Sequence, residues 1–144
     1  MNIEILLDED DNVHFLELGP RAGGNMIPVQ LSDAFGIDLI KANVQAAMGI
    51  EPDFLKTPVK AKNGCFMHYV LHSYKDGSFA GVTYDKHLRP YIYREVFYKK
   101  DGDVVEYFDG AGKAVGIIFL HFDTVEQMEY FCDNHNELVK ICLS

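Results

Sequence analysis

Residues 3–25 read IEILLDEDDNVHFLELGPRAGGN, and this stretch predicts how the fold begins. Two apolar runs, 3–7 and 13–18, flank the acidic segment Glu9 to Asn12. Two such runs around a polar turn are typical of a β-hairpin. The next seven residues, GPRAGGN, are too rich in glycine and proline for a helix or a strand. The chain is therefore expected to open with two antiparallel strands followed by a glycine-rich loop.

The register of this hairpin brings two carboxylates together. A turn centred between positions 10 and 11 pairs residues whose numbers sum to 21, which sets Glu4 directly opposite Glu17. Opposed Cβ atoms lie about 4.5 to 5.5 Å apart, and like charges at that distance are destabilising unless a cation lies between them. A slip of one residue would send the two side chains to opposite faces, so the interpretation depends on this register.

Two helices are expected after the loop. Pro28 to Phe35 predicts a short helix that ends at Gly36, and a second helix begins at Asp38, with apolar residues at helical spacing. Both helices are expected to lie against the sheet. Residues 50–64 have weak periodicity and are interpreted as a connection.

The second half of the chain changes character. Its β-branched and aromatic runs, separated by Asp-Gly and other glycine-containing turns, predict a mostly antiparallel sheet. These runs are 65–73, 79–84, 91–98, 104–108 and 114–122. Thr124 and Gln127 predict a capping box ahead of an amphipathic helix, and residues 138–143 predict a last strand. The fold class is α+β, with residues 1–50 and 51–144 expected to pack as one globular unit.

Composition narrows the functional classes. The chain has 144 residues, of which 48% are hydrophobic, enough for the core of one domain. No run approaches the eighteen or more apolar residues of a membrane span, and no signal peptide is evident, so we expect a cytoplasmic protein without a membrane partner. A net charge of −9 disfavours nucleic acid as a partner. Cys65, Cys132 and Cys142 are widely spaced among apolar neighbours and are expected to be buried, reduced thiols.

Three segments carry a family resemblance. Glu4-Ile-Leu-Leu, the run Glu17 to Asn25 and the later run Gly36-Ile-Asp-Leu-Ile-Lys resemble the end of the catalytic domain of ATP-grasp carboxylate-amine ligases. Residues 112–122, leading into the helix at Thr124, also resemble the closing region of these ligases. In that family a glutamate on one strand and an E-x-N-P-R run on the next hold magnesium against the ATP phosphates. The resemblance implies the C-terminal lobe of an ATP-grasp fold, with Glu4 and Glu17 as metal ligands.

The same resemblance implies a reaction. Arg21 is the expected catalytic residue, in contact with the γ-phosphate or an acyl phosphate, and the loop of Gly23, Gly24 and Asn25 is expected to bind ATP. ATP would phosphorylate a small-molecule carboxylate, and an amine substrate would then displace phosphate. The chemistry fits the residues, because magnesium prefers carboxylate and phosphate oxygens and is usually held by one or two carboxylates plus the phosphates of the substrate.

Two departures from the family pattern stand out. The usual asparagine of the E-x-N-P-R run is Gly19 here, which removes one oxygen ligand. The lysine-bearing subdomain and the adenine-clasping strands of the family lie upstream of the position of Glu4. The chain is therefore expected to be a fragment or split-gene product that is inactive alone, with the missing N-terminal ATP-grasp segments as its partner. ATP and magnesium are expected only in the full-length protein.

Other interpretations remain open from the sequence. Glu4 and Glu17 can be solvated strand carboxylates, and Arg21 can belong to a surface ion pair. The chain can be a non-catalytic module, derived from the ATP-grasp fold, that binds a ligand or partner, or an interaction domain related to it by structure only. His68 and His72 share a face of a strand but lack the spacing of a zinc motif. Antiparallel-sheet edges make a homodimer possible, and the sequence does not specify the two substrates.

Overall fold

The computed structural model describes residues 2–56 and 58–144. Its contacts divide the chain after Ala61 into two compact units, the second being Lys62–Ser144. The sequence placed this boundary after residue 50, and packing of both parts as one globular unit stays a prediction. Every strand pair in the described residues is antiparallel, so the expected α+β class with antiparallel sheets is confirmed.

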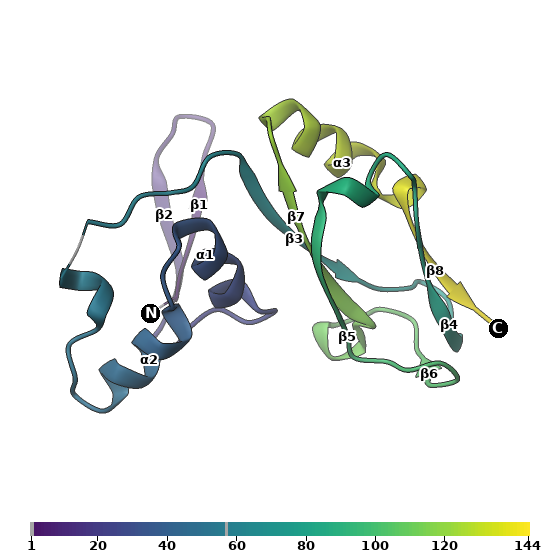
Figure 1. Cartoon of the computed structure of the whole chain (residues 1–144), viewed down its shortest axis with the longest axis horizontal. Coiled ribbons are helices and arrows are strands. Elements are labelled where there is room, and N and C mark those ends of the chain that lie inside the picture. The colour runs from purple at the N-terminus through teal and green to yellow at the C-terminus, as the bar shows by residue number, and fades with distance from the viewer. Residues whose placement is uncertain (1, 57) are drawn as a thin grey trace. The chain divides into compact units, whose positions relative to one another are not determined.

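The first unit opens on the expected hairpin (Figure 1). Strand β1 (Asn2–Leu7) pairs with strand β2 (Val13–Gly19), and Glu4 lies directly opposite Glu17, as predicted. The position of the turn, however, differs from the one predicted from the sequence. The strands close on a turn centred on Asp10, and a bulge at Leu16 then shifts the pairing by one residue.

Asp8 organises the turn. Its carboxylate accepts hydrogen bonds from the backbone N–H groups of Asp10 at 3.0 Å and of Asn12 at 2.9 Å, and it lies 2.8 Å from Nε2 of His14. The hydrogen bond with His14, followed by those with Asn12, lowers the pKa of Asp8 to about 2. The acidic turn is thus held by a defined network of hydrogen bonds.

We expect His14→Ala to raise the pKa of Asp8 from about 2 towards its ordinary value of 3.8. A folded-state pKa below the ordinary value means that Asp8 stabilises the hairpin above pH 3.8 and that this contribution is lost as the pH falls through about 2. A carbon NMR titration of the Asp8 carboxyl measures the shift. Glu9→Ala, which removes a turn acid outside the network, is the control, and an unchanged Asp8 pKa in His14→Ala would contradict the prediction.

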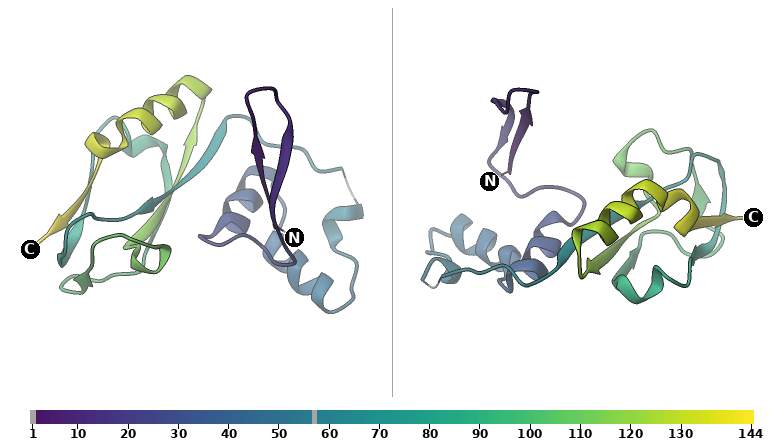
Figure 2. Two further views of the ribbon diagram at one scale, coloured as in Figure 1. Left: turned by 180° about the vertical axis from the view of Figure 1, so that it is seen from behind. Right: turned by 90° about the horizontal axis from the view of Figure 1, so that it is seen from above.

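One face of the hairpin is apolar and open to solvent. Strand alternation places six large side chains on the face opposite Glu4 and Glu17, and each is between 47% and 74% exposed. These are Ile3, Ile5, Leu7, Val13, Phe15 and Leu18. The apolar hairpin face, as we call these six residues, has no helix over it, and the right view of Figure 2 shows the hairpin standing clear of both helices.

The two expected helices are present. Helix α1 (Ile27–Phe35) ends at Gly36, whose φ of 65° suits glycine, and helix α2 (Leu39–Ala47) begins at Asp38, whose carboxylate accepts from the Lys41 N–H. The expectation that both helices lie against the sheet is wrong, because α1 packs on α2 instead. The connection that follows contains a 3-10 helix, Asp53–Lys56, which the sequence did not predict.

The second unit contains two three-stranded sheets, with helix α3 (Val125–Leu138) packed against strands of both. The first sheet has the order β3 (Cys65–Leu71), β7 (Gly116–Phe122), β5 (Ile92–Phe97), and the second has the order β6 (Val104–Val105), β4 (Gly77–Tyr84), β8 (Val139–Leu143). The capping box at the start of α3 is confirmed. Both sheets and α3 share one core, which includes Leu71, Phe79, Leu120, Phe122 and Phe131.

Two details differ from the sequence expectation. Strand β6 has only two residues and ends at Val105, because the N–H of Tyr107 donates to the carboxylate of Asp76 at 2.7 Å rather than to a strand. The three cysteines are free, but the expectation that they are buried is wrong: Cys132 is exposed, and Cys65 and Cys142 are half-buried. Among the residues that the structure describes, no helix is both long enough and apolar enough to cross a membrane.

Candidate functional site

The candidate site is the polar face of the hairpin, opposite the apolar hairpin face. Glu4 and Glu17 point from this face on paired strands, and both are exposed. Neither makes an ion pair with any cation among residues 2–56 and 58–144. Two opposed carboxylates without a counter-ion repel each other, and a bound cation would relieve that repulsion.

Arg21 lies beside this pair. Its Nη1 donates to the carbonyl oxygen of Ala22 at 3.0 Å, and its side chain is exposed. The described residues offer it no carboxylate partner, so the surface ion pair considered from sequence is not formed. Most of its guanidinium donors therefore remain available to an anionic ligand, for which the planar fork of arginine is well suited.

The glycine-rich loop follows Arg21 directly. A Cβ added to Gly23 would lie 2.9 Å from Cδ1 of Ile27, so Gly23 allows the loop to approach helix α1 closely. A Cβ added to Gly24 would meet nothing within 4 Å, which leaves its backbone open to a ligand. Asn25 and Met26 follow with left-handed φ values of 48° and 59°. Consecutive non-glycine residues in this region are strained, and such strain is concentrated at ligand sites.

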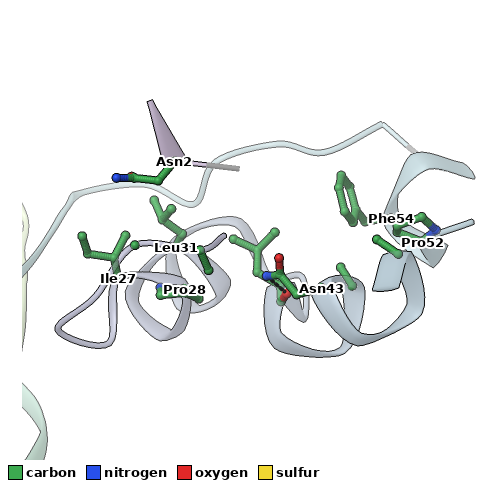
Figure 3. A pocket seen from close by; sticks show the side chains of 12 residues that line it. Asn2, Ile27, Pro28, Leu31, Asn43, Pro52 and Phe54 are labelled. Atoms are coloured by element: carbon green, nitrogen blue, oxygen red, sulfur yellow. Dashed lines mark hydrogen bonds between the residues drawn. The ribbon is translucent and has the colours of Figure 1, made fainter. Parts of the chain in front are cut away.

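A pocket of about 260 Å³ lies behind the glycine-rich loop (Figure 3). Its lining is mostly apolar, and Asn2 and Asn43 are its two carboxamides. The Asn43 side-chain nitrogen donates to the carbonyl of Leu39 at 2.7 Å. The lining comes from β1, the loop, both helices and the segment around Pro52, which no sequence period connects. The sequence analysis therefore did not predict this pocket.

The donor set fits magnesium better than a metal that needs a full protein cage. No group of three or more His, Cys, Asp and Glu side chains is close enough to hold a metal ion in the described part of the chain. Two hard carboxylate oxygen donors on one face are the protein contribution that magnesium accepts when phosphate and water complete its shell.

Comparisons with known proteins give structural likeness only. No family model matches the sequence, and no curated protein matches it. Phosphoribosylglycinamide synthetase from Anaerococcus prevotii matches 99% of this chain with a TM-score of 0.74 and 19% identity, over 36% of its own chain. L-amino acid ligase from Bacillus licheniformis matches 99% with a TM-score of 0.76 and 17% identity, over 35% of its own chain.

A third solved structure extends the set. N5-carboxyaminoimidazole ribonucleotide synthetase from Thermotoga maritima matches 99% of this chain with a TM-score of 0.66 and 14% identity, over 36% of its own chain. This chain has the fold of part of an ATP-grasp protein. The resemblance found in the sequence is thereby confirmed at the level of the fold. The ATP-grasp fold here spans about a third of the length of these matched chains.

The structure brings together most of the predicted site residues of this ATP-grasp fold. Glu4 and Glu17 are paired, and Arg21 and Gly23 follow on the same side of the hairpin end. Gly24 is exposed and stands in open space. One residue of the polar face was missed, although its signal was present: Asn2 precedes Glu4 by two positions and so shares its face.

Proposed function

We propose that this chain supplies the magnesium and phosphate contacts of an ATP-dependent carboxylate-amine ligase. The observation that carries the proposal is the direct pairing of Glu4 with Glu17 without a cation partner, next to an unpaired Arg21. The ATP-grasp fold supports it, because the matched structures are ligases and synthetases. The substrates are a small-molecule carboxylate, which becomes an acyl phosphate, and an amine.

Each residue has a distinct role in this proposal. Glu4 and Glu17 hold magnesium, which neutralises phosphate charge and polarises the transferring phosphoryl group when bound. Arg21 turns from the Ala22 carbonyl to the phosphate and stabilises the charge that develops on it. The open backbone of Gly24 offers an N–H group to a phosphate oxygen.

The remaining parts of the ligase come from outside this chain in our proposal. The matched chains are about three times as long, and the missing N-terminal ATP-grasp segments would hold the adenine. The apolar hairpin face gives these segments a surface to cover, since a two-stranded hairpin is only marginally stable by itself. A cytoplasmic location and a homodimer stay predictions.

The chain by itself is expected to bind ATP with magnesium weakly or not at all and to release no ADP when amino acids are added. The physical reason is that phosphate contacts on one exposed hairpin face cannot exclude water or hold the base. Titration calorimetry with ATP and magnesium, together with an assay for ADP, measures both properties. Micromolar ATP binding by the 144-residue chain would contradict our proposal that segments outside this chain hold the adenine.

One observation favours a second function. Gly19 stands where the E-x-N-P-R pattern has a neutral oxygen ligand, so the face can have lost metal chemistry while keeping its fold. A non-catalytic module that binds a ligand or partner would result. Manganese binding by the complete protein in the presence of ATP separates the two functions: a ligase binds the metal at Glu4 and Glu17, whereas a non-catalytic module does not.

A further inference from the structure

The polar face of the hairpin carries a third oxygen-bearing side chain. Asn2 and Glu4 are two residues apart on β1 and therefore point to the same face. Asn2 pairs with Gly19, and Glu4 pairs with Glu17. Asn2 is consequently the diagonal neighbour of Glu17, at a separation that longer side chains bridge. The three side chains form a triangle on one surface.

Gly19 leaves room inside this triangle. A Cβ added to Gly19 would lie 3.9 Å from Cβ of Asn2 and 3.8 Å from Oε1 of Glu17. It would also lie 3.8 Å from Cγ of Arg21, so the space at position 19 is bordered by Asn2, by the Glu17 carboxylate and by the aliphatic part of the Arg21 side chain. With glycine there, the Asn2 carboxamide and a cation can share that space.

The Asn2 side chain is not engaged elsewhere. Its carboxamide makes no hydrogen bond with any residue in the described ranges, although Asn2 is half-buried. Figure 3 shows it standing over Ile27 and Leu31, which offer no polar partner. Its Oδ1 lies 3.4 Å from the position that a Cβ of Gly23 would take, so it faces the glycine-rich loop. The Asn2 carboxamide is reached by solvent, because Tyr84 Oη is the one fully buried side-chain polar atom without a partner in the described residues, and it is therefore available to a ligand.

We propose that Oδ1 of Asn2 is the third protein ligand of the magnesium held by Glu4 and Glu17, in place of the side chain that Gly19 lacks. This inference rests on the proposed function. A carboxamide oxygen is a hard, neutral donor that magnesium accepts, and it adds no charge to a site where two carboxylates already balance the ion. The third ligand thus comes from β1 rather than from β2, directly across the pair from position 19.

Manganese is a suitable probe, because it takes the oxygen ligands of magnesium and broadens nearby amide signals. We titrate it, with ATP present, into the complete protein and follow the hairpin signals by NMR, which also report folding. Asn2→Ala is expected to weaken manganese binding by on the order of tenfold, in line with the loss of a residue that supports a metal site. Asn2→Asp, which keeps an oxygen ligand, is expected to retain binding.

A rescue variant tests the position of the ligand. Gly19→Asn is expected to restore manganese binding to the Asn2→Ala chain, because a side chain at position 19 meets only ordinary contacts and stands beside Glu17. Asn134→Ala removes a carboxamide of the second unit that donates to Tyr130 at 2.8 Å, and it should leave manganese binding unchanged.

The outcomes separate the inference from the function on which it rests. If Asn2→Ala binds manganese as strongly as wild type while Glu17→Gln does not bind it, Asn2 is not a ligand. The metal site formed by Glu4 and Glu17 would still be supported. No broadening of the hairpin signals in the wild-type complete protein with ATP would overturn the metal site itself, and the role of Asn2 with it. Failure of Gly19→Asn to restore binding would also count against Asn2 acting in place of a side chain at position 19.

Discussion

In the complete ligase that we propose, Glu17→Gln is expected to lower turnover by about a hundredfold to a thousandfold. The substitution keeps the shape of the side chain and its ability to accept a hydrogen bond, but it removes the negative charge that balances the metal beside the phosphoryl group. The same change relieves the repulsion between Glu17 and Glu4 across the strand pair, so the folded chain should be as stable as wild type or slightly more stable. Loss of activity without loss of stability separates a catalytic role from a structural one.

Two measurements test this pair of effects. Turnover is followed across a magnesium titration in the complete ligase, and the thermal midpoint is followed in the 144-residue chain. Glu9→Gln, which neutralises an exposed acid in the turn of the same hairpin, should change neither quantity. If Glu17→Gln turns over at the wild-type rate at every magnesium concentration, the assignment of Glu4 and Glu17 as metal ligands is wrong. They would then be solvated strand carboxylates.

Gly64→Ala is expected to lower the stability of the second unit by about 2 to 4 kcal/mol. Gly64 has a φ of 85°, which is unfavourable for alanine. An added Cβ would also lie 2.5 Å from the carbonyl oxygen of Phe122 and would meet the imidazole of His121. The carbonyl cannot move without disturbing β7, because Phe122 pairs with Cys65 at the first position of the β3–β7 ladder.

Gly102→Ala is the matched control for this change. Gly102 has nearly the same φ, 86°, but a Cβ there would meet nothing within 4 Å. The stability lost in Gly102→Ala should therefore come only from placing alanine at a positive φ, and should be about 1 kcal/mol. Denaturant unfolding of both variants measures the difference. Equal losses would show that the close approach of Gly64 to β7 contributes nothing, and that backbone conformation alone decides the cost.

The sequence predicted the register of the hairpin, but two errors cancelled. The turn is centred on Asp10 rather than between positions 10 and 11, and the bulge at Leu16 restores the pairing of Glu4 with Glu17. The bulge at Leu16 was not predicted, because the adjacent apolar residues Phe15 and Leu16 fit a continuous apolar run as well as they fit a bulged strand. The helix ends were predictable for a stronger reason: Gly36, Asp38 and Thr124 each satisfy backbone groups locally.

Features that depend on distant partners could not be predicted. Strand β6 ends early because Asp76, about thirty residues away in sequence, captures the N–H of Tyr107. The helices leave the apolar hairpin face uncovered because they pack on each other, which hydrophobic periodicity does not distinguish from packing on a sheet. Asn2 was not predicted for a different reason. A neutral carboxamide is a weaker sequence signal than the two opposed carboxylates on the same face.

The apolar hairpin face has a consequence for how the chain must be produced. Among the described residues β1 and β2 pair only with each other, so each also presents an unpaired backbone edge. Bare edges beside exposed Ile, Leu and Phe side chains are the features that promote strand-to-strand aggregation and that holding chaperones capture. The chain should therefore aggregate or be proteolysed unless this face is covered while the chain is being produced.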